Sequence, residues 1–160
     1  MAFGFFTGPG ATAGRPGVAD TTQKNTVGKV AIGNDGSEWI YLAGVASLVD
    51  GEVVAYQPGV FTAVRLATGV RGCIAVASAA VTAAKWGWFM IVGQDTVNTP
   101  SAIASNVPLF IGGVTGNLDD TAVKGDQILD AVLRSAGSQD GTATIQVNRA
   151  TVGFSNESTG

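Results

Sequence analysis

Short apolar segments recur along this chain at intervals of roughly ten residues, and glycine, proline or Asp-Gly turns separate most of them. Segments of this length, bounded in this way and rich in valine, isoleucine and aromatic residues, are typical of β-strands. The expected strands cover residues 39–42, 52–56, 60–66, 73–77, 86–92, 108–111 and 142–147. Strands at this spacing predict an all-β domain, a single compact β-sandwich or small barrel of the jelly-roll or β-tulip kind.

Three stretches are harder to assign from their pattern. Residues 127–134 fit a helical face and a strand face about equally well, and Asp126 could cap a helix. We favour a strand, because the neighbouring segments are β and Asp140-Gly141 sets up a hairpin into residues 142–147. Residues 78–85 are rich in alanine and predict a short helical turn, whereas residues 116–120 predict a turn between strands.

The first 29 residues differ from the rest of the chain. Glycine and proline are dense between positions 7 and 17, which rules out a helix or a central strand there. Phe3, Phe5 and Phe6 precede that stretch, and a solvated tail has no use for three phenylalanines. We therefore expect an extended N-terminal arm over residues 1–29 that becomes ordered on a partner, a β domain over 30–154 and a frayed tail over 155–160.

The composition favours contact with other proteins over other kinds of binding. Charged residues make up 13% of the chain, against roughly 25% in typical soluble domains, so the polar surface is mostly uncharged and easily desolvated. A small monomer with a neutral surface is the alternative. The net charge is −3 and the basic residues are scattered, which argues against nucleic acid as a partner. The apolar runs are too short to span a membrane, and the first residues do not resemble a signal peptide.

The sequence offers little for catalysis. It contains no histidine, which excludes Ser-His-Asp and Cys-His arrangements and most zinc sites. Cys73 is the only cysteine, so no disulfide within the chain is possible, and we expect it to be a small buried residue in a protein made in a reducing cytoplasm. Four carboxylates at positions 119, 120, 126 and 130 match no EF-hand and surround a lysine, so they predict a solvated turn rather than a calcium site. We expect no enzymatic activity, cofactor or metal.

The most distinctive segment is residues 86–92, which carries two tryptophans and no charge. In a strand, Trp86 and Trp88 share one face while Phe89 and Ile91 share the other, so both faces need cover. The hypothesis is that one face meets the domain core and the other a neighbouring subunit. The candidate interface residues are therefore Phe3, Phe5, Phe6, Trp86 and Trp88. The alternative, a carbohydrate platform that also includes Trp39, requires tryptophans lining an open groove instead of buried ones.

The order of several motifs resembles a known family. These motifs are Trp-Ile-Tyr-Leu-Ala-Gly-Val at 39–45, Gly-Glu-Val-Val-Ala-Tyr at 51–56, Ala-Val-Ala-Ser-Ala-Ala-Val at 75–81, Trp-Gly-Trp-Phe-Met-Ile-Val-Gly at 86–93, Val-Pro-Leu-Phe-Ile at 107–111, Gly-Asp-Gln-Ile at 125–128 and Ile-Gln-Val-Asn-Arg at 145–149. Across residues 38–152 the chain is similar to capsid decoration, or cement, proteins of tailed bacteriophages.

The resemblance implies a structural protein of the virion without catalytic residues. Such a protein is made in the host cytoplasm and binds the major capsid protein on the outer surface of the phage head. It often does so as a homotrimer, and it stabilises the shell. With the scattered basic residues and the short apolar runs described above, we expect neither nucleic acid nor a membrane as a partner. The alternative function is a carbohydrate- or receptor-binding β module of a virion.

Overall fold

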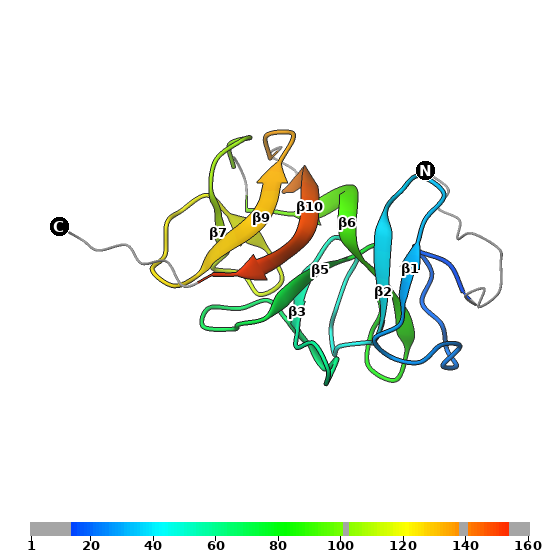
Figure 1. The fold of residues 1–160 in the computed structure, drawn as a ribbon. Helices are drawn as coiled ribbons and strands as arrows, with labels where there is room; N and C mark the ends of the chain where they lie inside the picture. Colours follow the sequence, from blue (N-terminus) through cyan, green and yellow to red (C-terminus); the bar gives the residue numbers. More distant parts are fainter. Residues whose placement is uncertain (1–13, 101–102, 138–140, 154–160) are drawn as a thin grey trace.

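The computed structural model describes residues 14–100, 103–137 and 141–153, which form one antiparallel β-sheet and no helix (Figure 1). The predicted all-β class is confirmed. The strands are β1 (Val30–Ile32), β2 (Glu38–Ala43), β3 (Val53–Tyr56), β4 (Ala63–Arg65), β5 (Cys73–Ala77), β6 (Trp86–Asn98), β7 (Leu109–Ile111), β8 (Leu118–Asp119), β9 (Gln127–Leu133) and β10 (Thr142–Val152).

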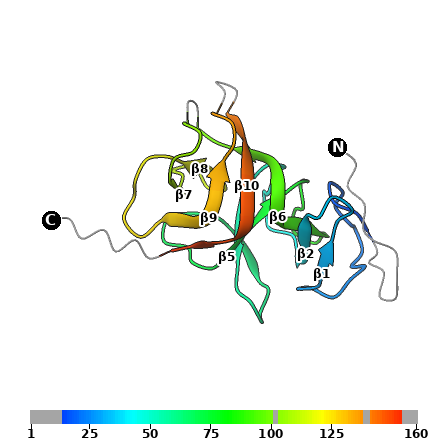
Figure 2. The same cartoon turned by 45° about the horizontal axis from the view of Figure 1, so that its top comes forward.

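The sheet is organised around β6, which pairs with β2, β5 and β10. The order of neighbouring strands is β1-β2-β6-β5-β10-β9-β7-β8, and β3 joins β5 to β4. In Figure 2, β10 lies between β9 and β6, although β9 and β6 are far apart in sequence. The strand predicted over residues 86–92 is therefore central, and it continues to Asn98 because β10 pairs with its second half.

Side chains of the central strands alternate between two hydrophobic clusters, one on each face of the sheet. The larger cluster includes Trp39 and Tyr41 of β2 and Trp88 and Met90 of β6. The second cluster takes the intervening residues of the same strands, Ile40 and Leu42 of β2 and Phe89 and Ile91 of β6. Strands covered on both faces have no polar face, which explains why these segments read as continuous apolar runs.

Most of the predicted strands are present, with corrected bounds. The strand favoured over residues 127–134 is confirmed as β9, so Asp126 caps no helix. The segment 60–66 forms a strand only at β4, because residues 57–61 make a turn in which the Phe61 N–H bonds the Gln57 carbonyl and Phe61 adopts a positive φ of 57°. The helical turn predicted over 78–85 is wrong, since those residues form bends and a turn, and 116–120 contains the short strand β8.

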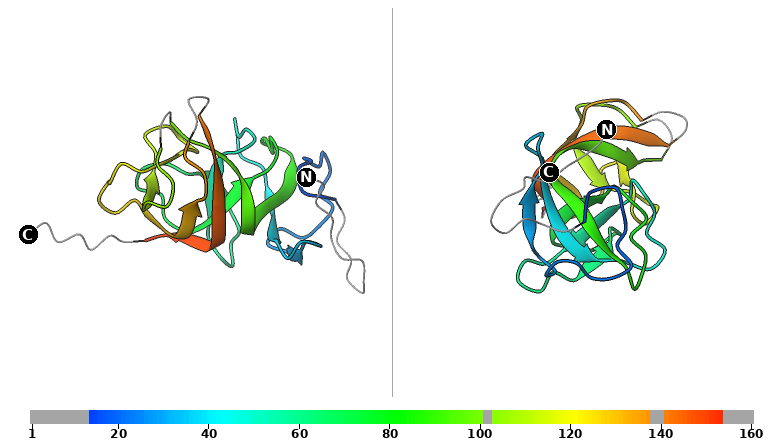
Figure 3. Two further views of the ribbon diagram at one scale, coloured as in Figure 1. Left: turned by 90° about the horizontal axis from the view of Figure 1, so that it is seen from above. Right: turned by 90° about the vertical axis from the view of Figure 1, so that its right-hand side faces the viewer.

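Two irregularities bend the sheet. The register of β2 on β6 shifts between Glu38 and Trp39, and the register of β10 on β9 shifts between Val147 and Thr151. Beyond the second shift, β10 leaves β6 and reaches β5, with Thr151 opposite Cys73. Bulges of this kind increase the local twist and turn a strand towards a new neighbour. The result is a strongly curved sheet, which Figure 3 shows from two directions.

Candidate functional site

The three tryptophans do not form an open platform. Trp39 and Trp88 lie in the larger hydrophobic cluster, where Trp88 is only 2% exposed, and Trp86 is half-buried beside them. The Trp88 ring meets the Tyr41 ring edge-on, with ring centroids 5.0 Å apart. The carbohydrate platform considered from the sequence is therefore not present at these residues.

The subunit interface at Trp86 and Trp88 stays a prediction, but the fold leaves little of these two side chains exposed. The two side chains do share a face of β6, but the chain's own strands β9 and β10 contribute residues to the cluster that covers it. Phe89 and Ile91, on the opposite face, are covered by the second cluster. Both faces of β6 are thus covered by residues of the same chain, so Trp88 offers almost no surface to a partner and Trp86 only part of its ring. Phe3, Phe5 and Phe6 lie outside the described residues.

Part of the predicted arm belongs to the domain itself. Asp20 forms an isolated β-bridge with Trp86, with backbone N–H to carbonyl distances of 2.7 and 3.0 Å. Its buried carboxylate accepts the Tyr41 hydroxyl at 2.9 Å and the Lys24 ammonium at 2.6 Å. Residues 14–29 therefore pack against β6 and β2, so the domain begins before residue 30 and the expected arm can include no more than residues 1–13.

Two other carboxylates are buried in ion pairs that the sequence did not predict. Glu52 pairs with Arg65 and accepts the Val49 N–H at 3.0 Å. Asp126 pairs with Arg71 at 3.1 Å and accepts the Gly69 N–H at 3.2 Å, so it does not belong to the expected solvated turn. The partners of these pairs are 13 and 55 residues apart, and no local pattern links them.

Asp119 ends β8, and its Oδ1 accepts the N–H of Asp120 at 2.8 Å and that of Thr121 at 3.2 Å in the bend that follows. Within the part of the chain that the structure describes, no three histidine, cysteine, aspartate or glutamate side chains gather as metal ligands. The same residues contain no helix long and apolar enough to cross a membrane.

Asp95 on β6 gives a pH-dependent contribution to stability. Burial raises the pKa of its carboxyl above the ordinary value of 3.8, although bonds from the Ser78 hydroxyl and the Thr96 N–H partly oppose this shift. A carboxyl with a raised native pKa binds its proton more tightly in the folded chain than in the unfolded chain. The stability that this carboxyl contributes is therefore lost as the pH rises from the pKa of the unfolded chain to the higher pKa of the folded chain.

Replacing Asp95 with asparagine should raise the melting temperature at pH 7, because the variant removes the desolvated charge, keeps an oxygen that accepts the Thr96 N–H, and offers an amide N–H to the Ser78 hydroxyl oxygen. The gain should disappear below about pH 4, where the wild-type carboxyl is protonated in both states. Thermal unfolding of the two proteins at both pH values checks this. A variant that is no more stable than the wild type at pH 7 would contradict it.

One end of the sheet is formed by the uncharged strand β1. Among the residues that the structure describes, β1 pairs with β2 alone, and its Val30 and Ile32 side chains are 44% and 54% exposed. The Gly33 N–H bonds the Ser37 carbonyl, and the Tyr41 N–H bonds the Lys29 carbonyl. In this register the backbone groups of Lys29, Ala31 and Gly33 point towards β2. The backbone groups of Val30 and Ile32, at the alternate positions, point away from β2. This edge can accept a further strand.

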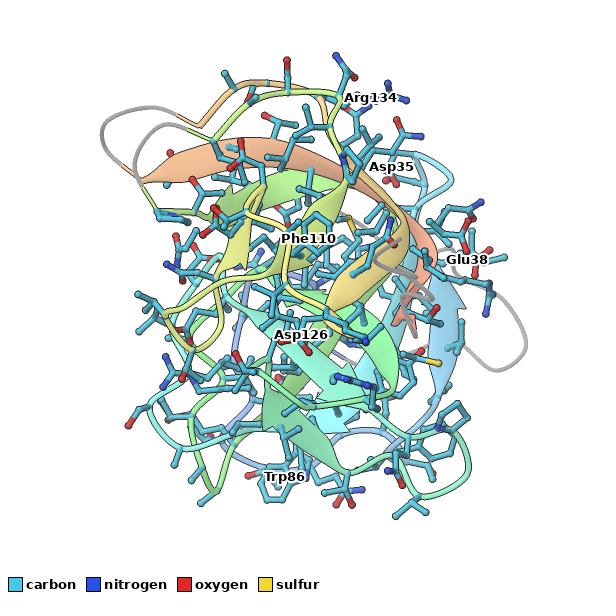
Figure 4. The ribbon with its side chains drawn as sticks, turned by 90° about the vertical axis from the view of Figure 1, so that its left-hand side faces the viewer. Asp35, Glu38, Trp86, Phe110, Asp126 and Arg134 are labelled. Atoms are coloured by element: carbon cyan, nitrogen blue, oxygen red, sulfur yellow. The ribbon has the colours of Figure 1, made fainter. Side chains whose placement is uncertain are left out.

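A polar surface lies elsewhere on the molecule. Figure 4 shows Asp35 and Arg134 near one end and Trp86 at the opposite end. A hollow of about 380 Å³ lies between the turn that joins β1 to β2 and the middle of β6 and β10, and Asp35, Gln94, Gln146 and Asn148 are among its lining residues. No sequence pattern indicates this hollow, because its residues come from three distant segments.

Comparison of the chain with protein-family models, with curated proteins and with solved structures found no match.

Proposed function

We propose that this protein is a structural component of a bacteriophage virion, a decoration or cement protein that binds the major capsid protein on the outer surface of the head. The observation that carries the proposal is the open edge at β1, with Val30 and Ile32 exposed and no charged side chain in the strand. Exposed edges of this kind are usually blocked by charge, proline or a covering segment, because they invite strand addition. Within the described residues no strand covers the outer side of β1, so this edge is suited to pairing with another chain.

The rest of the domain supports a binding role without catalysis. The buried carboxylates of Asp20, Glu52 and Asp126 are paired with cations of the same chain, so they stabilise the fold and are not exposed to a substrate. The low charge of the surface makes desolvation inexpensive when a second protein covers it. On a shell with many equivalent positions, weak edge contacts add to a stable association, especially if the protein binds as a homotrimer.

The test is whether the protein co-purifies with genome-filled particles in a fixed ratio to the major capsid protein. An Ile32→Lys variant should bind with markedly lower occupancy, because a lysine on the open edge opposes strand addition while its exposed position spares the fold. Val114→Lys is the matched control, since Val114 is 61% exposed and lies outside the named strands. A wild-type protein that never sediments with particles would overturn the proposal, and equal occupancy of the two variants would exclude β1 as the contact.

A further inference from the structure

We propose that a second surface, which we call the polar strip, binds a neutral oligosaccharide. The strip consists of Asp35, Gln94, Asp130, Gln146 and Asn148, and it lies where β6, β9 and β10 meet the turn between β1 and β2. This activity goes beyond capsid binding and uses none of the tryptophans.

The strip is hollowed on both sides of β10. The hollow of about 380 Å³ reaches from the β1–β2 turn across β6 to β10, and a second hollow of about 280 Å³ reaches from β10 to Asp130, Ala131 and Val132 of β9. The two hollows share Gln146, Val147 and Asn148. Together they form an elongated surface, which suits a chain of linked sugar rings better than a compact metabolite.

The backbone is irregular along this strip. Both register shifts of the sheet border it, at Glu38 on β2 and after Val147 on β10. Asp130 and Arg149, which are not glycines, both lie within the second shift and have positive φ angles of 61° and 52°. Backbone strain of this kind costs about 1–3 kcal/mol per residue, and it clusters at functional sites, where bulges redirect side chains.

The side chains of the strip are positioned by other groups of the protein. Asp35 Oδ1 accepts the Ser37 N–H at 3.0 Å and the Ser37 hydroxyl at 2.6 Å, and that hydroxyl accepts the indole N–H of buried Trp39 at 2.6 Å. These bonds from Ser37 hold the pKa of Asp35 below its ordinary value, so the carboxylate stays ionised. Because both Ser37 bonds reach Oδ1, Oδ2 is available as an acceptor for a ligand hydroxyl.

The amides are positioned in the same way. Gln146 Oε1 accepts the Arg134 Nε–H at 2.7 Å and lies 3.5 Å from Gln94 Nε2, which orients both amides along the strip. Planar amides and carboxylates carry donors and acceptors at a fixed separation, so they can bond two neighbouring hydroxyls of one sugar ring.

The charge around the strip favours an uncharged ligand. Arg149 is paired with Glu38, and Arg134 is bonded to Gln146, while Asp35 and Asp130 are the strip's own carboxylates. The surface therefore has no excess positive charge to attract phosphate or sulfate groups. A ligand with many hydroxyls and no charge satisfies its donors and acceptors without an electrostatic cost.

The experiment is a titration of the full chain with maltohexaose, cellohexaose, laminarihexaose and chitohexaose, followed by the backbone amide resonances in two-dimensional NMR. At least one of these sugars should shift resonances confined to residues 35–37, 92–94, 130–132 and 146–148, with an affinity of about 1 mM. Asn148→Ala should weaken that binding by about tenfold, whereas Gln57→Ala, a change at an exposed residue outside the strip, should leave it unchanged.

Three results would overturn the proposal. The first is the absence of confined shifts with all four sugars at about 10 mM, well above the expected dissociation constant. The second is binding of a sulfated hexasaccharide alone, which would mean that charge and not hydroxyl groups is recognised. The third is a response to hexaglycine without a response to the sugars, which would make the strip a peptide groove. The isolated chain is used throughout, so the result does not depend on whether the protein binds capsids.

Discussion

Replacing Phe89 with alanine is expected to lower the free energy of unfolding by about 3–5 kcal/mol. Phe89 is fully buried in the second hydrophobic cluster, on the central strand β6, opposite Ile40 of β2 and Ala77 of β5. The truncation removes the transfer free energy of an aromatic ring and leaves a cavity between strands that cannot easily close. A loss of this size is a large share of the stability of an ordinary domain.

Urea denaturation of the wild type and the variant measures this loss. Phe89→Leu should retain most of the stability, because it keeps an apolar side chain that fills much of the same space. Val114→Ala should change the free energy by no more than about 0.5 kcal/mol, because Val114 is 61% exposed. If Phe89→Ala unfolds at the same urea concentration as Val114→Ala, the second cluster is not a core.

Trp88→Ala should destabilise the fold by a similar amount, about 3–5 kcal/mol, through the larger cluster on the opposite face. The variant loses the edge-on contact with Tyr41 as well as the buried area of the indole. Trp86→Ala is the matched control, on the same strand and the same face but half-buried, and its effect on stability should be clearly smaller.

Thermal unfolding and sedimentation of both tryptophan variants separate folding from association. We expect Trp88→Ala to lower the melting temperature whether or not the protein associates, because the Trp88 side chain is buried by residues of its own chain. A Trp88→Ala protein that keeps the wild-type melting temperature but associates less would instead support the subunit interface inferred from the sequence.

Local patterns predicted the strands well, because the period of two and the turn residues are properties of short segments. The sharing of faces by Trp86 and Trp88 follows from β geometry alone. What covers each face does not, since it depends on the pairing of β6 with β10 about fifty residues later and on the bulge that carries β10 to β5. An apolar face that is covered within the chain and one that is covered by a partner have the same sequence pattern.

The same limit explains why the polar contacts could not be predicted. Asp20 looks like an ordinary polar residue beside a stretch rich in glycine. In the fold it is buried, and its carboxylate accepts a hydrogen bond from Tyr41, 21 positions away. The polar strip combines Asp35, Gln94 and Gln146, none of which belongs to a recognisable motif. Left-handed conformations at Asp130 and Arg149 are also invisible in the sequence, because neither residue is a glycine.

The position of β10 in the sheet has a consequence for how the protein is synthesised. β10 is the last strand within the described residues, yet it lies between β9 and β6 and also reaches β5. A nascent chain that has not yet made residues 142–152 leaves the second half of β6 and all of β9 without their shared neighbour. Until then, two strand edges stay open to other chains, as in slowly folding β proteins whose pairings are distant in sequence. Folding of the domain can be completed only after nearly the whole of the described chain has left the ribosome.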